Sequence, residues 1–225
     1  MAEDQRKYPS YRIVCQKGYG EYEEKKSRFI ASVAPAATEQ EALDFIDAVR
    51  KKYYDARHNC HAFIIGRNKE LTRCSDDGEP SGTAGKPMLE VLMKAEVTDV
   101  VMVVTRYFGG TLLGTGGLVR AYTQAAQNGL QDAGIVLMQY KVEMRIQIDY
   151  VDVGKVQYLL GTEGIEISES RYTERVEFDI RIPKEREKTV EKALIEATSG
   201  RARIEAMGAG YYMDKQFIDK GNFMG

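Results

Sequence analysis

The clearest periodic pattern in the chain is an alternation of apolar and polar positions between residues 140 and 150. Every second residue is apolar, and each residue between them is polar or charged. The apolar positions are Tyr140, Val142, Met144, Ile146, Ile148 and Tyr150. A period of two is typical of a β-strand with one face on a core, so the pattern predicts a half-buried strand.

The rest of the second half predicts two helices and three more strands. The strands are expected over 165–172, 176–183 and 202–212. A short helix around Val156 is ended by glycines, and a second helix covers 184–198 with Gly200 just beyond it. The order β-α-β-β-α-β is the ferredoxin-like arrangement, one antiparallel sheet with two helices on one face. We therefore predict a C-terminal domain at 139–212, followed by a loose tail at 213–225.

The first half also mixes helices and strands. Thr38 followed by Glu41 is a capping box, and apolar residues at helical spacing come after it, which predicts a helix starting there. Further elements are expected as helices over 87–95 and 116–132 and as strands over 11–17, 27–33, 60–66 and 100–105. The sequence thus predicts an α+β N-terminal domain at 1–138.

Composition and charge limit the class of protein. The 225 residues are 43% hydrophobic, enough for a packed core, and their net charge of -2 argues against coating nucleic acid by bulk electrostatics. Three scattered cysteines without a Cys-x-x-Cys pair indicate a reducing, cytoplasmic setting. No signal-peptide core and no bilayer-length apolar run is present, so we expect a soluble protein without a membrane partner.

A glycine-rich turn follows the apolar run at 100–104. It contains Gly109, Gly110, Gly114, Gly116 and Gly117. Glycines let backbone N–H groups face a ligand, and a helix N-terminus adds partial positive charge, so the turn suits a phosphate or carboxylate clamped by Arg106 and Arg120. Close packing of the loop explains the glycines equally well, because their spacing matches neither the dinucleotide-binding nor the Walker pattern.

Aromatic residues stand beside Arg106 in this turn. Tyr107 can stack on a base or ribose, whereas core packing is the expected role of Phe108. His58 or His61 is expected as a hydrogen-bonding member of the same pocket. On a strand, His58 and Cys60 point one way and His61 the other, so we expect neither a metal site nor a cofactor.

An acidic loop precedes the helix predicted at residue 87. Asp76, Asp77 and Glu79 have the chemistry of a divalent-cation site or a general base, and equally that of a solvated turn. Hydroxyl groups of Ser81 and Thr83 are expected to cap the helix that follows.

Five sequence blocks carry a resemblance to the IMPACT/YigZ family over roughly residues 22–130, with a C-terminal extension like that of bacterial members. The blocks are at 26–30, 56–60, 76–85, 106–110 and 113–122. The resemblance implies an α+β first domain of the kind found in a small-subunit ribosomal protein and elongation factor G, and a ferredoxin-like second domain. Eukaryotic relatives are translation regulators that restrain a kinase of an initiation factor. No catalytic mechanism comes with the resemblance.

We therefore expect a cytoplasmic translation-regulator-like protein that binds RNA, the ribosome or a nucleotide phosphate. The phosphate-binding residues are expected to be Arg57, His58, Lys86, Arg106, Tyr107, Gly109, Gly110, Gly114, Gly116, Gly117 and Arg120. The adjoining polar pocket is expected to contain Asp76, Asp77, Glu79, Ser81 and Thr83. Two alternatives stay open: a metal-assisted enzyme acting on a small phosphorylated or peptide-like substrate, and a module that binds a translation-related protein.

Overall fold

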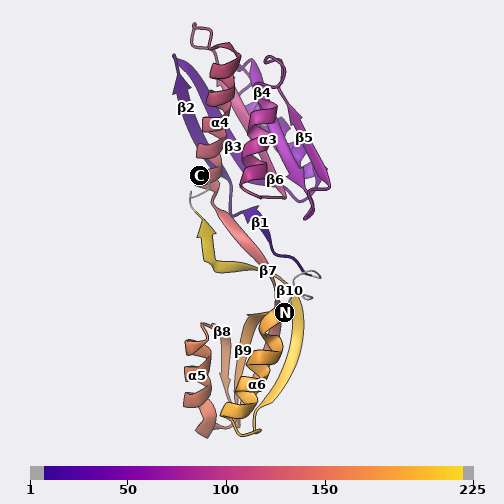
Figure 1. The fold of residues 1–225 in the computed structure, drawn as a ribbon, viewed down its shortest axis with the longest axis vertical. Coiled ribbons are helices and arrows are strands. Elements are labelled where there is room, and N and C mark those ends of the chain that lie inside the picture. Colours follow the sequence, from indigo (N-terminus) through magenta and orange to yellow (C-terminus); the bar gives the residue numbers. More distant parts are fainter. Residues whose placement is uncertain (1–7, 220–225) are drawn as a thin grey trace. The chain divides into compact units, whose positions relative to one another are not determined.

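The computed structural model describes residues 8–219, with side chains described for 8–214. Within this range the chain forms two compact units, one built mainly on residues 11–137 and the other on 138–213. Each unit has its own β-sheet and its own hydrophobic core (Figure 1). The predicted α+β class with two domains is confirmed.

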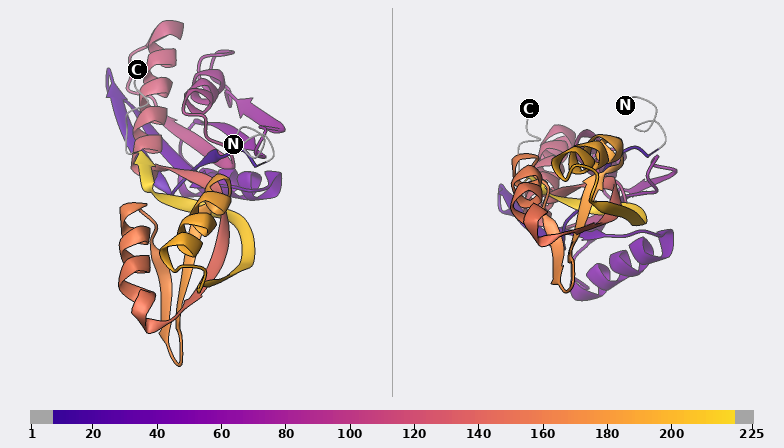
Figure 2. Two further views of the ribbon diagram at one scale, coloured as in Figure 1. Left: turned by 60° about the horizontal axis from the view of Figure 1, so that its bottom comes forward. Right: turned by 90° about the horizontal axis from the view of Figure 1, so that it is seen from below.

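The N-terminal unit is a five-stranded antiparallel sheet with helices on both faces. Its strands follow the order β2 (Gly18–Glu24), β3 (Ser27–Pro35), β6 (Val100–Tyr107), β4 (His58–Ile65) and β5 (Leu71–Ser75). Its helices are α2 (Glu39–Lys52), α3 (Gly85–Lys94) and α4 (Gly114–Ala133). Helices α3 and α4 pack on one face of the sheet and α2 packs on the other, as Figure 2 shows from two further sides.

Local sequence explains why these elements form. Strand β6 is central and buried on both faces, which its run of valines favours. Helix α2 begins where the capping box predicts, because the Thr38 hydroxyl accepts a hydrogen bond from the Glu41 N–H at 3.2 Å.

Two strands of this unit, β2 and β5, are not predicted by the sequence pattern. In β2, Gly18 and Gly20 resemble a loop signal, yet they are needed for packing: a Cβ on Gly20 would lie 2.3 Å from the Gly129 nitrogen of α4. The predicted strand at 11–17 is shorter than expected, since β1 covers Tyr11–Val14.

The C-terminal unit has the predicted ferredoxin-like order. Its elements are β7 (Ile135–Ile148), α5 (Val153–Thr162), β8 (Ile167–Tyr172), β9 (Val176–Pro183), α6 (Glu187–Ala197) and β10 (Arg203–Asp219), with one-turn 3-10 segments at Tyr150–Asp152 and Lys184–Arg186. The strands of this sheet follow the order β1-β7-β9-β8, and β10 also pairs with β7. Apolar residues of β7 and β9 face α5 and α6 and form the core of this unit.

Both ends of the predicted C-terminal domain differ from the structure. Strand β10 continues to Asp219 instead of ending at residue 212, so the predicted loose tail begins too early; residues 220–225 lie outside the described range. At the other end, Tyr8 stacks on Tyr140 with ring centroids 3.9 Å apart, so residues 8–10 belong to the C-terminal unit. No helix among the described residues is long and apolar enough to span a membrane.

Candidate functional site

A hollow of 580 Å³ opens at one end of the N-terminal sheet, where β4 begins and β6 ends. We call it the sheet-end pocket; its lining residues are Asp55, Arg57, His58, Arg106, Tyr107, Phe108 and Leu112. Antiparallel pairing places His58 opposite Arg106, which brings the Arg-His block and the Arg-Tyr-Phe block together. Four of the residues predicted for phosphate binding thus line one hollow.

The rim of this pocket is open to solvent. Arg57 is exposed and forms no ion pair or hydrogen bond with the side chains described here. Phe108 is 55% exposed and Leu112 is 83% exposed, so the predicted core role of Phe108 is wrong. The Tyr107 hydroxyl donates to Asp55 Oδ1 at 2.7 Å, and this hydrogen bond raises the pKa of Tyr107 to about 12.

Arg106 differs from Arg57 because its guanidinium is buried and paired. Its side chain is 8% exposed, and Nη1 donates to Glu79 Oε1 at 2.7 Å. The guanidinium carbon lies 5.4 Å from the Phe29 ring centroid and 5.7 Å from that of Phe108. The Arg106 guanidinium therefore packs against the exposed Phe108 ring, and the charge of Arg106 is already compensated by Glu79.

Glu79 also accepts a hydrogen bond of 2.9 Å from the Tyr122 hydroxyl on α4. The Cys60 thiol on β4 lies 3.3 Å from the same hydroxyl. Burial raises the pKa of Cys60 to about 12 and also raises that of Tyr122, so both groups keep their protons at neutral pH. We call Arg106, Glu79, Tyr122 and Cys60 the buried polar network; it ties β6, the acidic loop, α4 and β4 to one another.

Asp76 caps helix α3 from nine residues before its first residue. Its carboxylate accepts hydrogen bonds from the N–H groups of Gly82, Ala84 and Gly85 at 2.8, 3.0 and 2.9 Å. Burial alone would raise the pKa of Asp76, but these three donors outweigh it and hold the pKa below its usual value. The cap residue Ala84 has no side-chain cap of its own.

The predicted capping role of Ser81 and Thr83 is therefore wrong. Ser81 is exposed, and the buried Thr83 hydroxyl donates to the Pro80 carbonyl at 2.6 Å. A capping hydroxyl must stand directly at the helix start, whereas the folded-back loop brings the Asp76 carboxylate to that position.

Asp77 fixes the other side of the acidic loop. Its carboxylate accepts from Arg50 Nη2 at 3.0 Å and from the Asn59 N–H at 2.7 Å. His58 Nδ1 lies 2.9 Å from the Asp77 carbonyl oxygen, to which it donates when Nδ1 carries the proton. The carboxylates of Asp76, Asp77 and Glu79 thus all have partners, and no cluster of three metal-ligating side chains occurs within the described part of the chain.

The motif glycines serve different purposes. A Cβ on Gly109 would lie 2.1 Å from the Lys26 carbonyl carbon, so only glycine fits there. Gly110 and Gly114 have φ angles of +86° and +70°, which glycine adopts without strain. A Cβ on Gly117 would approach Leu113, whereas Gly116 faces more open space.

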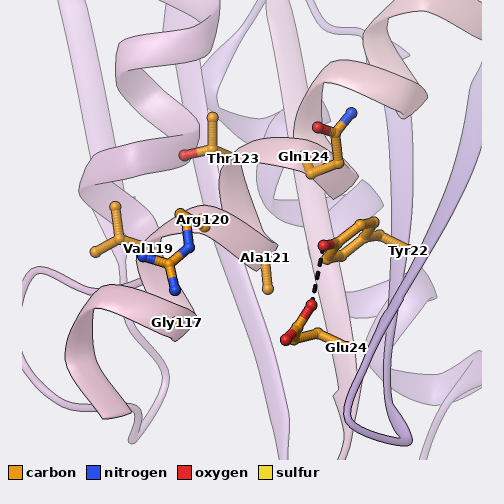
Figure 3. Close-up of a pocket in the computed structure, with 8 residues that line it drawn as sticks. All are labelled: Tyr22, Glu24, Gly117, Val119, Arg120, Ala121, Thr123 and Gln124. Atoms are coloured by element: carbon orange, nitrogen blue, oxygen red, sulfur yellow. Dashed lines mark hydrogen bonds between the residues drawn. The ribbon is translucent and has the colours of Figure 1, made fainter. Parts of the chain in front are cut away.

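The structure does not bring Arg120 and Lys86 into the sheet-end pocket. Arg120 lines a separate hollow of 300 Å³ between α4 and β2, drawn in Figure 3. Lys86 is exposed on the first turn of α3. The single anion clamp of Arg106 and Arg120 is therefore absent from the described residues.

Two lysines that the sequence reasoning did not assign to the site lie beside the glycine turn. Lys25 and Lys26 form the β2–β3 turn with φ angles of 46° and 65°, and both are exposed. The backbone of Lys26 packs against Gly109. The place of Lys26 in the block at 26–30 was a usable signal, but its contact with a turn more than eighty residues away was not visible in the sequence.

Comparison with known proteins gives matches to both units. The Impact N-terminal domain matches residues 25–130, and a domain of unknown function (DUF1949) matches residues 146–201. IMPACT family member YvyE of Bacillus subtilis (strain 168) is 40% identical over 206 residues, which cover 92% of this chain and 94% of that protein. IMPACT family member YigZ of Escherichia coli (strain K12) is 39% identical over 161 residues, 71% of this chain and 79% of the relative.

A solved structure described as a hypothetical protein is also similar. It has a TM-score of 0.56 and 34% sequence identity, and the alignment covers 88% of this chain and 98% of the other. Protein IMPACT of Xenopus laevis matches a shorter stretch, 35% identical over 96 residues, which is 40% of this chain and 30% of that protein. Since bacterial relatives match along most of their length and both units have their own domain match, this chain belongs to the IMPACT family.

Proposed function

We propose that the N-terminal unit binds single-stranded RNA at the sheet-end pocket, as part of a translation-regulating role in the cytoplasm. The observation that carries this proposal is an exposed arginine, without a partner among the described side chains, beside an exposed aromatic ring in one hollow. Arg57 supplies the cation and Phe108 the ring. Proteins that bind single strands combine these two elements, a positive groove for the phosphates and aromatic faces for the bases.

The environment of each residue supports its role. Arg57 is free to form charge-assisted hydrogen bonds with a phosphate, because no carboxylate among the described residues pairs with it. The Phe108 ring is positioned by Arg106 beneath it, so it loses little freedom when a base stacks on its outer face. Lys25 and Lys26 add positive charge at the neighbouring turn.

The enzymatic alternative has less support from the same residues. A general base or metal ligand needs a carboxylate that is available to substrate or cation. Asp76 is bonded to backbone donors, Asp77 to Arg50 and Asn59, and Glu79 to Arg106 and Tyr122. Translation as the setting is inferred from the family to which the chain belongs, and it comes to this protein as part of the proposal.

The test compares Arg57→Ala and Phe108→Ala with a matched control. Arg73→Ala removes an exposed arginine from β5, opposite Phe63 and five residues along β4 from His58, so it changes net charge equally outside the pocket. Binding of a short unstructured RNA and of intact ribosomes is measured by fluorescence anisotropy and co-sedimentation at several salt concentrations.

Each variant has its own expected signature. Arg57→Ala weakens binding and lowers the slope of log affinity against log salt by about 0.7, the value for one phosphate contact with a single strand. Phe108→Ala weakens binding by about 1–3 kcal/mol, as loss of one stacked base does, and leaves the slope unchanged. Equal affinities for wild type, both variants and Arg73→Ala contradict the site. Ribosome binding that persists without RNA binding indicates a protein partner instead.

A further inference from the structure

Helix α4 and strand β2 touch at one end and separate at the other. At Gly18 and Gly20 the backbones meet, since a Cβ on Gly18 would lie 2.3 Å from the Ala133 nitrogen. Further along β2, the side chains of Tyr22 and Glu24 stand between strand and helix. The glycines let the elements touch and the larger residues hold them apart, which leaves the 300 Å³ hollow of Figure 3, here named the α4–β2 pocket.

A row of α4 side chains, spaced four residues apart, lies along the contact between α4 and β2. Asp132 accepts from the Tyr19 N–H at 2.8 Å, and Asn128 donates to the Glu21 carbonyl at 2.8 Å, so these two side chains bond the backbone of β2. Gln124 donates to Asn128 at 3.0 Å. Arg120 is next in the row, and it forms no hydrogen bond or ion pair with the described side chains. The pocket therefore opens where none of the hydrogen bonds described above joins α4 to β2.

Opposite charges face each other across this pocket. Arg120 and Glu24 lie on opposite sides of the hollow in Figure 3, and they do not form an ion pair. The Tyr22 hydroxyl donates to Glu24 Oε2 at 3.1 Å, which holds the carboxylate in place and leaves Oε1 for another donor. Val119 and Ala121 add apolar side chains to the lining of the hollow. The pocket is thus complementary to a small molecule with a negative end and a positive end.

We propose that the α4–β2 pocket binds a small zwitterion of the α-amino-acid type, with its carboxylate on Arg120 and its ammonium group on Glu24. Guanidinium and carboxylate match in bidentate geometry, and Glu24 offers the acceptor that an ammonium group requires. The volume is at the lower end of the range for small-molecule sites, about 300–1,000 Å³, which suits a free amino acid or a dipeptide. This site is separate from the sheet-end pocket, so the proposal does not rest on RNA binding.

The experiment uses the full chain and probes that differ in one charge each. L-alanine and L-alanyl-L-alanine carry both charges, N-acetyl-L-alanine lacks the ammonium group, and L-alaninamide lacks the carboxylate. Inorganic phosphate tests for a plain anion site at Arg120. Affinities are measured by titration calorimetry for wild type, Arg120→Gln and Glu24→Gln. The matched controls are Arg73→Gln and Glu23→Gln, the latter on the opposite face of β2.

We expect a zwitterion to bind and each single-charge analogue to bind about tenfold to a hundredfold more weakly. This ratio corresponds to the loss of one hydrogen bond to a charged group. Arg120→Gln removes the discrimination between alanine and alaninamide, and Glu24→Gln removes that between alanine and N-acetylalanine. Comparing the first two probes distinguishes a free amino acid from a dipeptide. The proposal is overturned if neither zwitterion binds, if phosphate binds Arg120 more tightly than both, or if the two pocket variants behave like their controls.

Discussion

The sheet-end pocket and the buried polar network beneath it use the same residue types for opposite purposes. Arg57 is exposed and has no ion pair or hydrogen bond with the side chains of residues 8–214, whereas the Arg106 side chain is 8% exposed and bonded to Glu79 at 2.7 Å. Phe108 is 55% exposed, while Phe29, the other ring near the Arg106 guanidinium, is fully buried. The partner of a motif residue therefore decides whether that residue maintains the fold or is available to a ligand.

The two regions also differ in what they contribute to the free energy of folding. A buried charge is tolerated only when it is paired, so removing one member of the network leaves the other desolvated and uncompensated. An exposed, unpaired arginine contributes little to folding because water solvates it in both states. Mutations in the network should therefore change stability, and mutations at the rim should change binding.

The largest effect is expected from Glu79→Ala. It leaves Arg106 as a buried, unpaired cation and removes the acceptor of the Tyr122 hydroxyl, so the free energy of unfolding falls by about 3–5 kcal/mol. Urea denaturation followed by circular dichroism measures it. Arg57→Ala is the control and changes stability by less than about 0.5 kcal/mol. A loss under 1 kcal/mol in Glu79→Ala would mean that Arg106 finds water or another partner, and the comparison would fail.

The network shows where sequence reasoning stops. Its four members are Cys60, Glu79, Arg106 and Tyr122. The local sequence pattern predicts only the type of element that contains each of them: a strand for Cys60, a loop for Glu79, a strand for Arg106 and a helix for Tyr122. Which arginine pairs with which carboxylate depends on the register that sets His58 opposite Arg106, and no local pattern states it. The sequence therefore predicts the segment but does not separate the role of Arg57 from that of Arg106.

Secondary structure was predictable where one physical signal dominated. The alternation at 140–150 falls on β7 up to Ile148 and ends at the 3-10 segment Tyr150–Asp152, and the Thr38 capping box starts α2. Strand β2 was missed because Gly18 and Gly20, which weaken a strand in isolation, are required by the helix that packs on it. The two glycines are needed for tertiary contact with Gly129 and Ala133 of α4, which lie more than a hundred residues further along the chain.

The next largest difference in stability is expected between substitutions of two adjacent glycines, Gly109 and Gly110. A Cβ on Gly109 collides with the Lys26 backbone, so Gly109→Ala is expected to cost at least about 1–3 kcal/mol through forced repacking. Gly110 has open space around it and only its φ of +86° disfavours a side chain, so Gly110→Ala costs about 1 kcal/mol. Urea unfolding of both variants gives the ranking. The reverse order would show that the loop does not pack on the β2–β3 turn.

The smallest effect, and the one with a pH signature, is expected from Asp76→Asn. An amide cannot accept hydrogen bonds from all three N–H groups at the start of α3, so this variant is less stable by about 1 kcal/mol at neutral pH. Because the pKa of Asp76 is lowered in the folded state, its contribution is complete above the unfolded pKa of about 3.9 and is lost as the pH falls through the folded value.

The stability gap between wild type and Asp76→Asn should therefore narrow as the medium is acidified below that pH, and urea unfolding at neutral and acidic pH measures it. Ser81→Ala is the matched control in the same loop, and it should leave stability unchanged at every pH because Ser81 is exposed and does not cap the helix. A gap that stays constant into acid would show that the charge on Asp76 does not hold the start of α3. The acidic loop would then belong with the exposed rim, and the division between fold-maintaining and ligand-accessible motif residues would have to be redrawn at that position.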